Sequence, residues 1–257
     1  IHCHDWQSGL VPVFLKTVFN DNPFYWNIKT IMTIHNLRFQ GVWDIKTIKG
    51  ITGLPDYLFT PDKLEYNKDA SMLKGGLVYA DYITTVSNTY AGEIQMGYYG
   101  EGLDGLLRAR NNSLCGILNG IDYDDYNPIS DPHIYFNYSN WNFRTEKVKN
   151  KKALQAELGL PVDERKYMIA IISRLTDQKG LDLIDWVMHG ICDENVQLVI
   201  LGTGDPQYEN MFKHYQWIMS DRVSANIYYS DELAHKIYAA ADALLMPSRF
   251  EPCGLTQ

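Results

Sequence analysis

The chain has 257 residues, of which 46% are apolar and 21% are charged, and this balance is typical of a globular protein with a sizeable core. Its formal net charge of −8 argues against nucleic-acid binding, and no apolar run approaches the length of a membrane span. Four scattered cysteines and the lack of a secretory leader predict free thiols and a cytoplasmic protein.

Short apolar runs alternate with amphipathic stretches along the first half of the chain. Strands are expected over residues 28–34, 82–86 and 114–118, and a helix is expected over 71–79. Ser-Asn-Thr at 87–89 is typical of the N-cap of a further helix. The alternation predicts parallel βαβ units and therefore an α/β fold.

A polar, aromatic-rich stretch over residues 122–144 separates the two halves, and we expect a domain boundary there. One domain would cover residues 1–124 and the other 125–257. Both halves resemble half of a Rossmann-like sheet, so the sequence predicts two such domains. The expected elements of the second half are a helix over 147–158, a strand over 167–172, a helix starting near 180, strands over 196–201 and 226–229, a helix over 231–240 and a strand over 243–246.

In open parallel sheets, ligands bind beyond the carboxyl ends of the strands, so polar residues directly after each expected strand are candidates for a site. Arg174 and Lys179 lie on either side of a predicted strand-to-helix turn. The backbone N–H groups of such a turn, together with two cations, would favour an anionic ligand such as a phosphate. The alternative is a pair of solvated surface charges.

Glu251 and the residues after it form a second candidate. Pro252 suits the first position of a helix, where its missing N–H is not needed. Glu251 would then lie beside a pocket lined by the free amides of the next residues, although an ordinary capped helix is the alternative. These residues are Cys253, Gly254, Leu255 and Thr256.

Further polar residues follow expected strands, and most have an ordinary structural explanation. His35 could be a buried histidine, Asn119 could belong to a turn, and Tyr229 could belong to the core. Asp5 follows the short segment at the start of the chain. The triplet at 122–124 imitates the D-x-D pattern of a metal–sugar-nucleotide site, but its polar surroundings favour a loop.

Eight segments in order carry a specific pattern: HCHDWQSGLVPVFL (2–15), TIHNLRFQG (33–41), ADYITTVSNTYAGEI (80–94), EGLDGLLRAR (101–110), ILNGIDYDDYNP (117–128), SRLTDQKGLDLI (173–184), LGTGDP (201–206) and PSRFEPCGLTQ (247–257). Together they resemble the motif series of the bacterial-type glycogen and starch synthases. The resemblance covers essentially the whole chain.

The resemblance implies the GT-B fold, in which two Rossmann-like domains face a deep cleft. The first domain would supply the acceptor side and the second would bind the nucleotide sugar. The implied activity is a retaining transfer of glucose from ADP-glucose to the non-reducing end of an α-1,4-glucan, such as glycogen or a maltooligosaccharide, with release of ADP. The resemblance implies no metal, no cofactor and no protein nucleophile, because the leaving diphosphate oxygen can take the acceptor's proton.

The matched positions also imply roles for the candidate residues. Arg174 and Lys179 would hold the donor diphosphate, and Glu251 would lie close to the transferred sugar. The amides of residues 253–256 would bind glucose hydroxyls and phosphate. The other matches are His35 and Asn119 on the transferred glucose, Tyr229 on the adenine, and Asp5 near the acceptor.

The chain departs from the family pattern at its ends. The family's catalytic unit opens with a K-[ST]-G-G-L loop; Lys74 begins a similar tetrapeptide here, but it falls in the expected helix 71–79, so we do not assign it to the donor. The chain starts in an apparent strand and stops at Gln257, soon after the helix expected at Pro252. We therefore expect a fragment with two incomplete domains, inactive by itself.

Two other functions remain open. The chain could be a truncated nucleotide- or glucan-binding module without turnover. It could also come from a related GT-B transferase that uses another nucleotide sugar, although PSRFEPCGLTQ argues against this. Neither a nucleic acid nor a membrane is expected as a partner.

Overall fold

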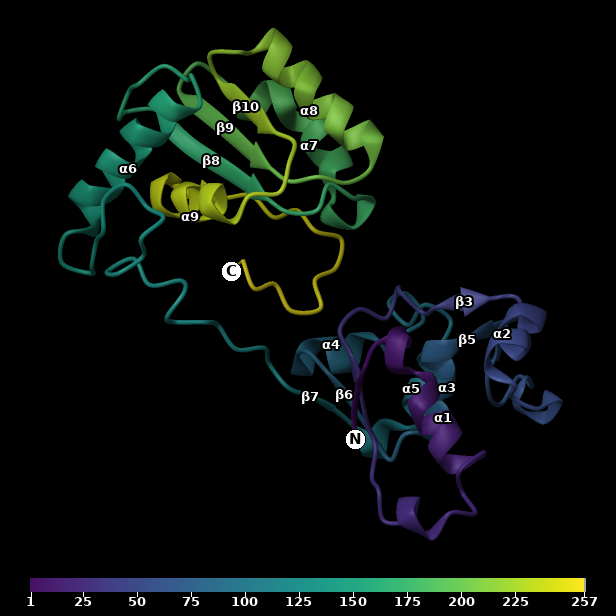
Figure 1. Ribbon diagram of the computed structural model, residues 1–257. Coiled ribbons are helices and arrows are strands. Elements are labelled where there is room, and N and C mark those ends of the chain that lie inside the picture. The colour runs from purple at the N-terminus through teal and green to yellow at the C-terminus, as the bar shows by residue number, and fades with distance from the viewer. Residues whose placement is uncertain (257) are drawn as a thin grey trace. The chain divides into compact units, whose positions relative to one another are not determined.

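The structure, a computed structural model, describes residues 1–256 and divides into two compact units (Figure 1). Unit 1 comprises residues 1–120 and 252–255, and unit 2 comprises residues 121–251 and 256. Each unit contains a four-stranded parallel sheet, so the predicted α/β class is confirmed. The acceptor and nucleotide-sugar roles of the two expected domains stay predictions. Gln257, the last residue of the final motif, lies outside the described residues.

The parallel sheet of unit 1 is built from short strands with buried apolar side chains. Met32, Ile34 and Ile83 are fully buried, as expected for strands covered on both faces. Because the strands are parallel, their carboxyl ends share one edge of the sheet. In spatial order the strands are β1 (His2–His4), β2 (Ile31–Ile34), β6 (Tyr82–Thr85) and β7 (Leu114–Gly116).

Polar caps begin three helices of unit 1. The side chains of Asp44, Ser71 and Ser87 each accept a hydrogen bond from the backbone N–H three residues later. The α-helices of this unit are α1 (Leu10–Lys16), α2 (Ile45–Thr52), α3 (Met72–Tyr79), α4 (Asn88–Glu93) and α5 (Asp104–Ala109). A small antiparallel sheet has the order β3 (Val42–Trp43), β5 (Asp69–Ser71), β4 (Glu65–Tyr66). The 3-10 turns of unit 1 are Trp6–Ser8, Pro23–Tyr25, Asp56–Leu58 and Asn111–Ser113.

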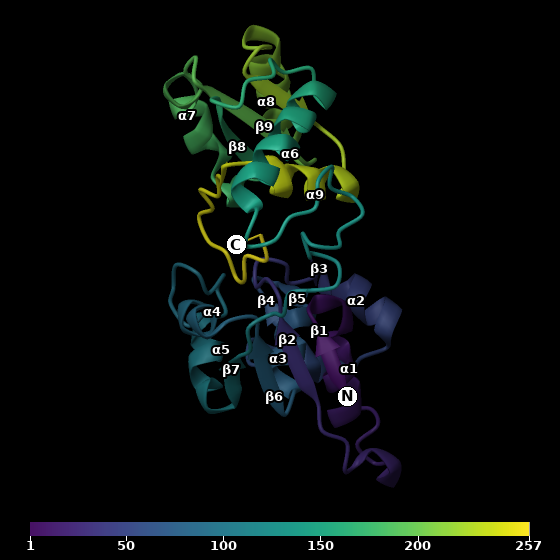
Figure 2. The same cartoon turned by 90° about the vertical axis from the view of Figure 1, so that its left-hand side faces the viewer.

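Unit 2 has helices on both faces of its sheet (Figures 1 and 2). In spatial order the strands are β10 (Val223–Asn226), β9 (Val196–Leu201), β8 (Tyr167–Ile172) and β11 (Ala243–Leu244). The helices are α6 (Phe143–Glu157), α7 (Leu181–Ile191), α8 (Pro206–Ile218) and α9 (Asp231–Ala240), and Asp177–Lys179 forms a 3-10 turn.

Alternate residues of β9 serve the two faces of this sheet. Leu198 and Ile200 pack in one apolar cluster with residues of α7 and α8. Val199 and Leu201 pack in the other with residues of α6 and α9. Side chains alternate across a strand, so a continuous apolar run such as 198–201 needs a helical layer on each face.

Most expected elements are confirmed, and the differences lie at their ends. The helix expected over 147–158 begins earlier, at Phe143, and the strand expected over 28–34 begins later, at Ile31. Just before the observed start of that strand, the backbone N–H of Thr30 donates to Asp81 Oδ2 (2.8 Å) rather than to a neighbouring strand. The strands expected over 82–86, 114–118 and 243–246 end one to two residues earlier than predicted, because edge residues of a strand lose their pairing first.

Two predictions for the second half of the chain are wrong. The strand expected over 226–229 is β10, Val223–Asn226, whose register pairs it with β9. Tyr228 and Tyr229 follow this strand and are exposed, so the aromatic residues that suggested a strand belong to the loop after it.

The second wrong prediction is the helix expected from Pro252, because the described residues after it form a bend and a turn and no helix. The carbonyl of Pro252, which would start a helical hydrogen-bond ladder, accepts a hydrogen bond from the Ser87 hydroxyl (2.8 Å) instead. A single turn is also too short to form a stable helix by itself.

Among residues 1–256, no helix is long and apolar enough to cross a membrane.

Candidate functional site

Two cavities lie beyond the carboxyl ends of the unit 2 strands. The larger has a volume of about 290 Å³ and the smaller about 20 Å³. Ser173, which directly follows β8, lines both of them. The larger cavity is also lined by Arg174, Gly202, Thr203, Tyr228 and Tyr229. The loops after β8, β9 and β10 therefore meet at one cavity, as expected for an open parallel sheet.

Backbone hydrogen bonds hold the loops after β8 and β9 together. The N–H of Leu175 donates to the carbonyl of Thr203 (2.9 Å), and the carbonyl of Leu175 accepts from the N–H of Asp205 (2.8 Å). Gly202 has φ +153°, and a Cβ there would lie 1.9 Å from the carbonyl oxygen of Ser173. Only a glycine allows the two loops to approach this closely.

Arg174 and Tyr229 are the predicted site residues that the structure brings to the larger cavity. The Tyr229 side chain is 86% exposed, so the alternative of a core tyrosine is wrong. Its ring is accessible to a planar ligand, and the Arg174 guanidinium adds a permanent positive charge. The cavity can therefore hold an aromatic group together with an anion.

Lys179 and Glu251 form an ion pair beside the smaller cavity. Lys179 Nζ lies 3.0 and 2.9 Å from the two carboxylate oxygens of Glu251, and the side chains are only 17% and 20% exposed. Lys179 also lines the smaller cavity. A lysine ammonium has three donors, so one remains for a ligand when two face Glu251.

Contacts between the loops after β8 and β11 bring these two residues together across 72 positions of sequence. The N–H of Arg249 donates to the carbonyl of Gln178 (2.9 Å), and its guanidinium donates to Asp182 (2.6 Å). Gly180 has φ +64°, and a Cβ there would lie 2.2 Å from the carbonyl oxygen of Pro247. The close approach of these loops fixes the ion pair.

Two serines that the sequence reasoning missed complete the smaller cavity. Ser173 and Ser248 both line it, and within the described residues their buried hydroxyl oxygens make no hydrogen bond. A cavity of this size accommodates about one water-sized group, such as a single hydroxyl or phosphate oxygen. Their positions just after β8 and in the loop after β11 were the signal that could have identified them.

The four residues after Pro252 are placed differently from the prediction. Thr256 lines the smaller cavity with Lys179. Cys253, Gly254 and Leu255 lie outside any helix or strand and are grouped with unit 1. Because the expected helix is absent from this segment, its amides are not aligned by a helix start, and their contacts with a ligand stay a prediction.

In unit 1, Asp5 and His35 lie together at the carboxyl edge of the sheet. The backbone N–H of His35 donates to Asp5 Oδ1 (2.8 Å), and Asp5 has φ +50°. His4 Nδ1 and His35 Nε2 are 2.9 Å apart. Burial, followed by the neighbouring His2 and His35 rings, lowers the pKa of His4, which favours its neutral form near pH 7. His35 is exposed, so the alternative of a buried histidine is wrong.

Asn119 lies in the segment that follows β7 and is half-buried. The preceding part of this segment is fixed to the sheet, because the N–H of Ile117 donates to the carbonyl of Thr85 (2.7 Å). Asn119 therefore leaves the same edge of the sheet as His35, and its contact with a ligand stays a prediction.

Lys74 has a structural role, which agrees with leaving it out of the proposed sugar-donor site. Its ammonium donates to the backbone carbonyls of Pro61 (2.6 Å) and Glu65 (2.5 Å). Partial burial lowers the pKa of Lys74.

The chain matches two known families and many known proteins. The family model described as "Starch synthase catalytic domain" matches residues 1–109, and the model described as "Glycosyl transferases group 1" matches residues 155–257. Over all 257 residues the chain is 65% identical to a glycogen synthase of Lachnospira eligens, 66% to that of Lachnoclostridium phytofermentans and 54% to that of Thermotoga maritima.

These matches cover the whole chain but only 54%, 54% and 52% of the three relatives, so the chain spans about half the length of the curated relatives it matches. A solved structure of the catalytic domain of starch synthase IV from Arabidopsis thaliana, bound to ADP and acarbose, superposes with a TM-score of 0.91 at 33% identity. It covers all of this chain, which covers 53% of that structure. The chain therefore belongs to the starch and glycogen synthase family of glycosyltransferases, with the GT-B fold.

Proposed function

We propose that the protein is a glycogen synthase, which transfers glucose with retention from ADP-glucose to the non-reducing end of an α-1,4-glucan. The observation that carries the proposal is the cavity at the carboxyl edge of the unit 2 sheet, lined by Arg174 and Tyr229 beside the Lys179–Glu251 ion pair. The ADP and acarbose of the Arabidopsis structure support a nucleotide and a glucan-like ligand for this protein too.

The larger cavity would take the nucleotide. Its volume of about 290 Å³ is at the lower end of the range for small-molecule sites. The exposed Tyr229 ring would pack on the adenine, and Arg174 would bind the diphosphate. A planar base on an aromatic ring buries apolar area without needing a dedicated hydrogen bond.

The smaller cavity would take one oxygen of the phosphate nearest the glucose. Lys179 has one donor left for a phosphate oxygen, and the hydroxyls of Ser173 and Ser248 are available as further donors. Thr256 borders the same cavity. These groups are fixed by the loops after β8 and β11, so little reorganisation is needed when charge develops on the phosphate.

The bond that breaks joins the anomeric carbon of glucose to the diphosphate, and its electron pair passes to the phosphate oxygen. Arg174 and Lys179 would stabilise that charge, and the Glu251 carboxylate would stabilise the positive character on the sugar. The hydroxyl oxygen of the acceptor then bonds the same face of the anomeric carbon, while its proton passes to the departing phosphate oxygen. We propose that this transfer uses neither a metal ion nor a cofactor, since two side-chain cations carry the charge.

For unit 1 we propose that His35 and Asn119 contact the transferred glucose and that Asp5 lies near the acceptor. The hydrogen bond from the His35 backbone to Asp5 Oδ1 supports this assignment, because it fixes the backbone of His35 relative to Asp5. Asp5 would thus also position His35.

A binding module without turnover is the second candidate, because the chain spans about half the length of its curated relatives. Titrating the chain with ADP and, separately, with maltoheptaose, beside a glucose-transfer assay of the protein in its natural length, distinguishes the two. ADP binding that is accompanied by transfer supports the synthase. Binding without transfer at either length supports the module.

A further inference from the structure

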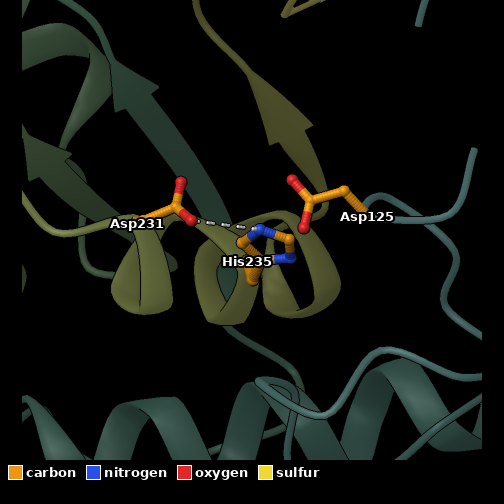
Figure 3. A group of neighbouring side chains, drawn as sticks. All are labelled: Asp125, Asp231 and His235. Carbon is orange, nitrogen blue, oxygen red and sulfur yellow. Dashed lines mark ion pairs between the residues drawn. The ribbon is translucent and has the colours of Figure 1, made fainter. Parts of the chain in front are cut away.

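Three metal-ligating side chains meet in unit 2, away from the Lys179–Glu251 pair. Asp231 and His235 lie one turn apart on α9, and Asp125 reaches them from the segment that precedes α6 (Figure 3). One potential ligand atom from each lies within 4.8 Å of the other two. Asp125 and Asp231 are exposed, whereas His235 is only 2% exposed.

The buried imidazole of His235 is oriented by a second carboxylate. Its Nδ1 lies 2.6 Å from Asp131 Oδ2, and Asp131 is 5% exposed. The other oxygen of Asp131 accepts the backbone N–H of His133 (2.8 Å). The hydrogen bond to Asp131 places a ring proton on Nδ1, because a carboxylate can only accept, and this leaves the lone pair on Nε2.

The second nitrogen, Nε2, is buried and makes no hydrogen bond within the described residues. It is directed at Asp231, whose Oδ2 lies 3.8 Å away (Figure 3). A buried polar atom without a hydrogen bond is costly and calls for an explanation. A metal-ligating histidine typically shows this arrangement, with one nitrogen donating to a carboxylate and the other bound to the ion.

We propose that Asp125, Asp231 and Nε2 of His235 bind a divalent cation of the zinc type, with Asp131 as the outer carboxylate that orients the imidazole. One imidazole and two carboxylates are a ligand set that suits Zn²⁺, with water completing the coordination. Ligand atoms around Zn²⁺ lie roughly 3.5 Å apart, so the exposed carboxylates close inward slightly when the ion binds.

The ion would join the segment before α6 to α9. Asp122 holds the turn that carries Asp125, since its carboxylate accepts the backbone N–H groups of Asp124 (2.9 Å) and Asp125 (3.1 Å). Tyr126 stacks on the His235 ring, with centroids 4.5 Å apart and planes 10° apart. The proposed role of the ion is to stabilise this corner of unit 2. Asp231 also lines the larger cavity, so the ion would lie at the border of that cavity, but none of the three ligands is assigned a role in glucosyl transfer.

Without an ion, the three side chains would lie together with no shared ligand, and the test separates the two states. Zn²⁺ is titrated by calorimetry into the full chain and into D125N, D231N and D124N. Asp125 and Asp231 are exposed, so their variants keep the core intact. Asp124 is a matched control: it is the exposed neighbour of Asp125 but is not one of the three ligands.

We expect one Zn²⁺ site whose affinity falls at least about tenfold in D125N and in D231N and is unchanged in D124N. Saturating Zn²⁺ should also raise the melting temperature of the parent chain and of D124N, but not that of D231N. Zn²⁺ binding to cysteines or to other histidines would persist equally in all four proteins. Equal affinities in all four, or no binding to the parent chain, would overturn the proposal.

Discussion

At the scale of single residues, the chemistry that we propose for unit 2 depends on the Lys179–Glu251 ion pair. The two groups are less than one quarter exposed and are fixed by the loops that carry them. Such a pair adds little to stability, because the desolvation of both charges offsets their attraction. Its value lies in holding a cation and a carboxylate at the place where, in our proposal, opposite charges develop.

Replacing either residue should therefore affect catalysis more than folding. In the protein at its natural length, K179A and E251A should each lower kcat by about 10²–10³, the usual effect of losing one preorganised charge. Steady-state kinetics and thermal melting, measured together, check this. K213A is the matched control, because Lys213 forms a longer surface pair with Glu209 (3.8 Å) and should keep full activity. Near-parental kcat in K179A would contradict the assigned role.

Tyr229 should matter for binding rather than for stability, since its side chain is 86% exposed. Base–aromatic stacking contributes about 1–3 kcal/mol, so Y229A should weaken ADP binding roughly 5- to 150-fold. Calorimetric titration with ADP measures this. Tyr98 in unit 1 is similarly exposed (78%), so Y98A serves as the control. Equal ADP affinity in Y229A and Y98A would exclude the stacking role.

At the scale of elements, the glycines at the ends of the unit 2 strands hold the site together. Gly180 begins α7 in the left-handed region and lies against the Pro247 carbonyl. This contact packs the loop after β8 on the loop after β11, and it therefore determines where Lys179 meets Glu251. The geometry of the site thus depends on a position that carries no side chain.

Substituting two glycines of the same region tests that dependence. G180A should lower the free energy of unfolding by at least about 1–2 kcal/mol, because alanine is strained at positive φ and its Cβ would meet the Pro247 carbonyl. G190A is the matched control, since Gly190 lies near the end of α7 and a Cβ there meets nothing within 4 Å. Denaturant unfolding should show G190A equal to or more stable than the parent. A G180A variant as stable as G190A would rule out this account of the loops.

The sequence predicted the elements whose patterns are continuous and buried. The strand over 196–201 and the helix over 231–240 were predicted with their observed bounds, because an apolar run or a capped amphipathic stretch determines them locally. The strand at 226–229 was misplaced, because Tyr228 and Tyr229 have high strand propensity but stand outside the pairing register. The helix at Pro252 was also wrong, since its carbonyl bonds Ser87, far away in the sequence.

The candidate site shows the same division. Residues after strands could be identified from the sequence, because parallel topology brings strand ends to one edge. Two other features could not be identified from the sequence: the ion pair of Lys179 with Glu251, and the unsatisfied hydroxyls of Ser173 and Ser248. Both depend on how two loops 72 residues apart pack on each other. The Asp231–His235 spacing on one helix was a signal that the sequence offered, but its partner Asp125 comes from a distant segment.

At the scale of the whole molecule, the chain spans about half the length of its curated relatives. Catalysis depends on holding all contributing groups in register, so losing some of them lowers the reaction rate more than it weakens binding. We predict that the 257-residue chain binds ADP weakly and does not elongate a glucan. Glucose transfer to glycogen by the isolated chain, with the protein in its natural length as the positive control, checks this. Turnover within about tenfold of that control would contradict it.

The central claim, that this protein is an ADP-glucose-dependent glucan synthase, is tested most directly by comparing donors. The protein in its natural length is assayed for transfer of labelled glucose to glycogen from ADP-glucose and from UDP-glucose, and kcat/KM is measured for each. We predict a clear preference for ADP-glucose that Y229A reduces. A preference for UDP-glucose, or no transfer from either donor, would contradict the account.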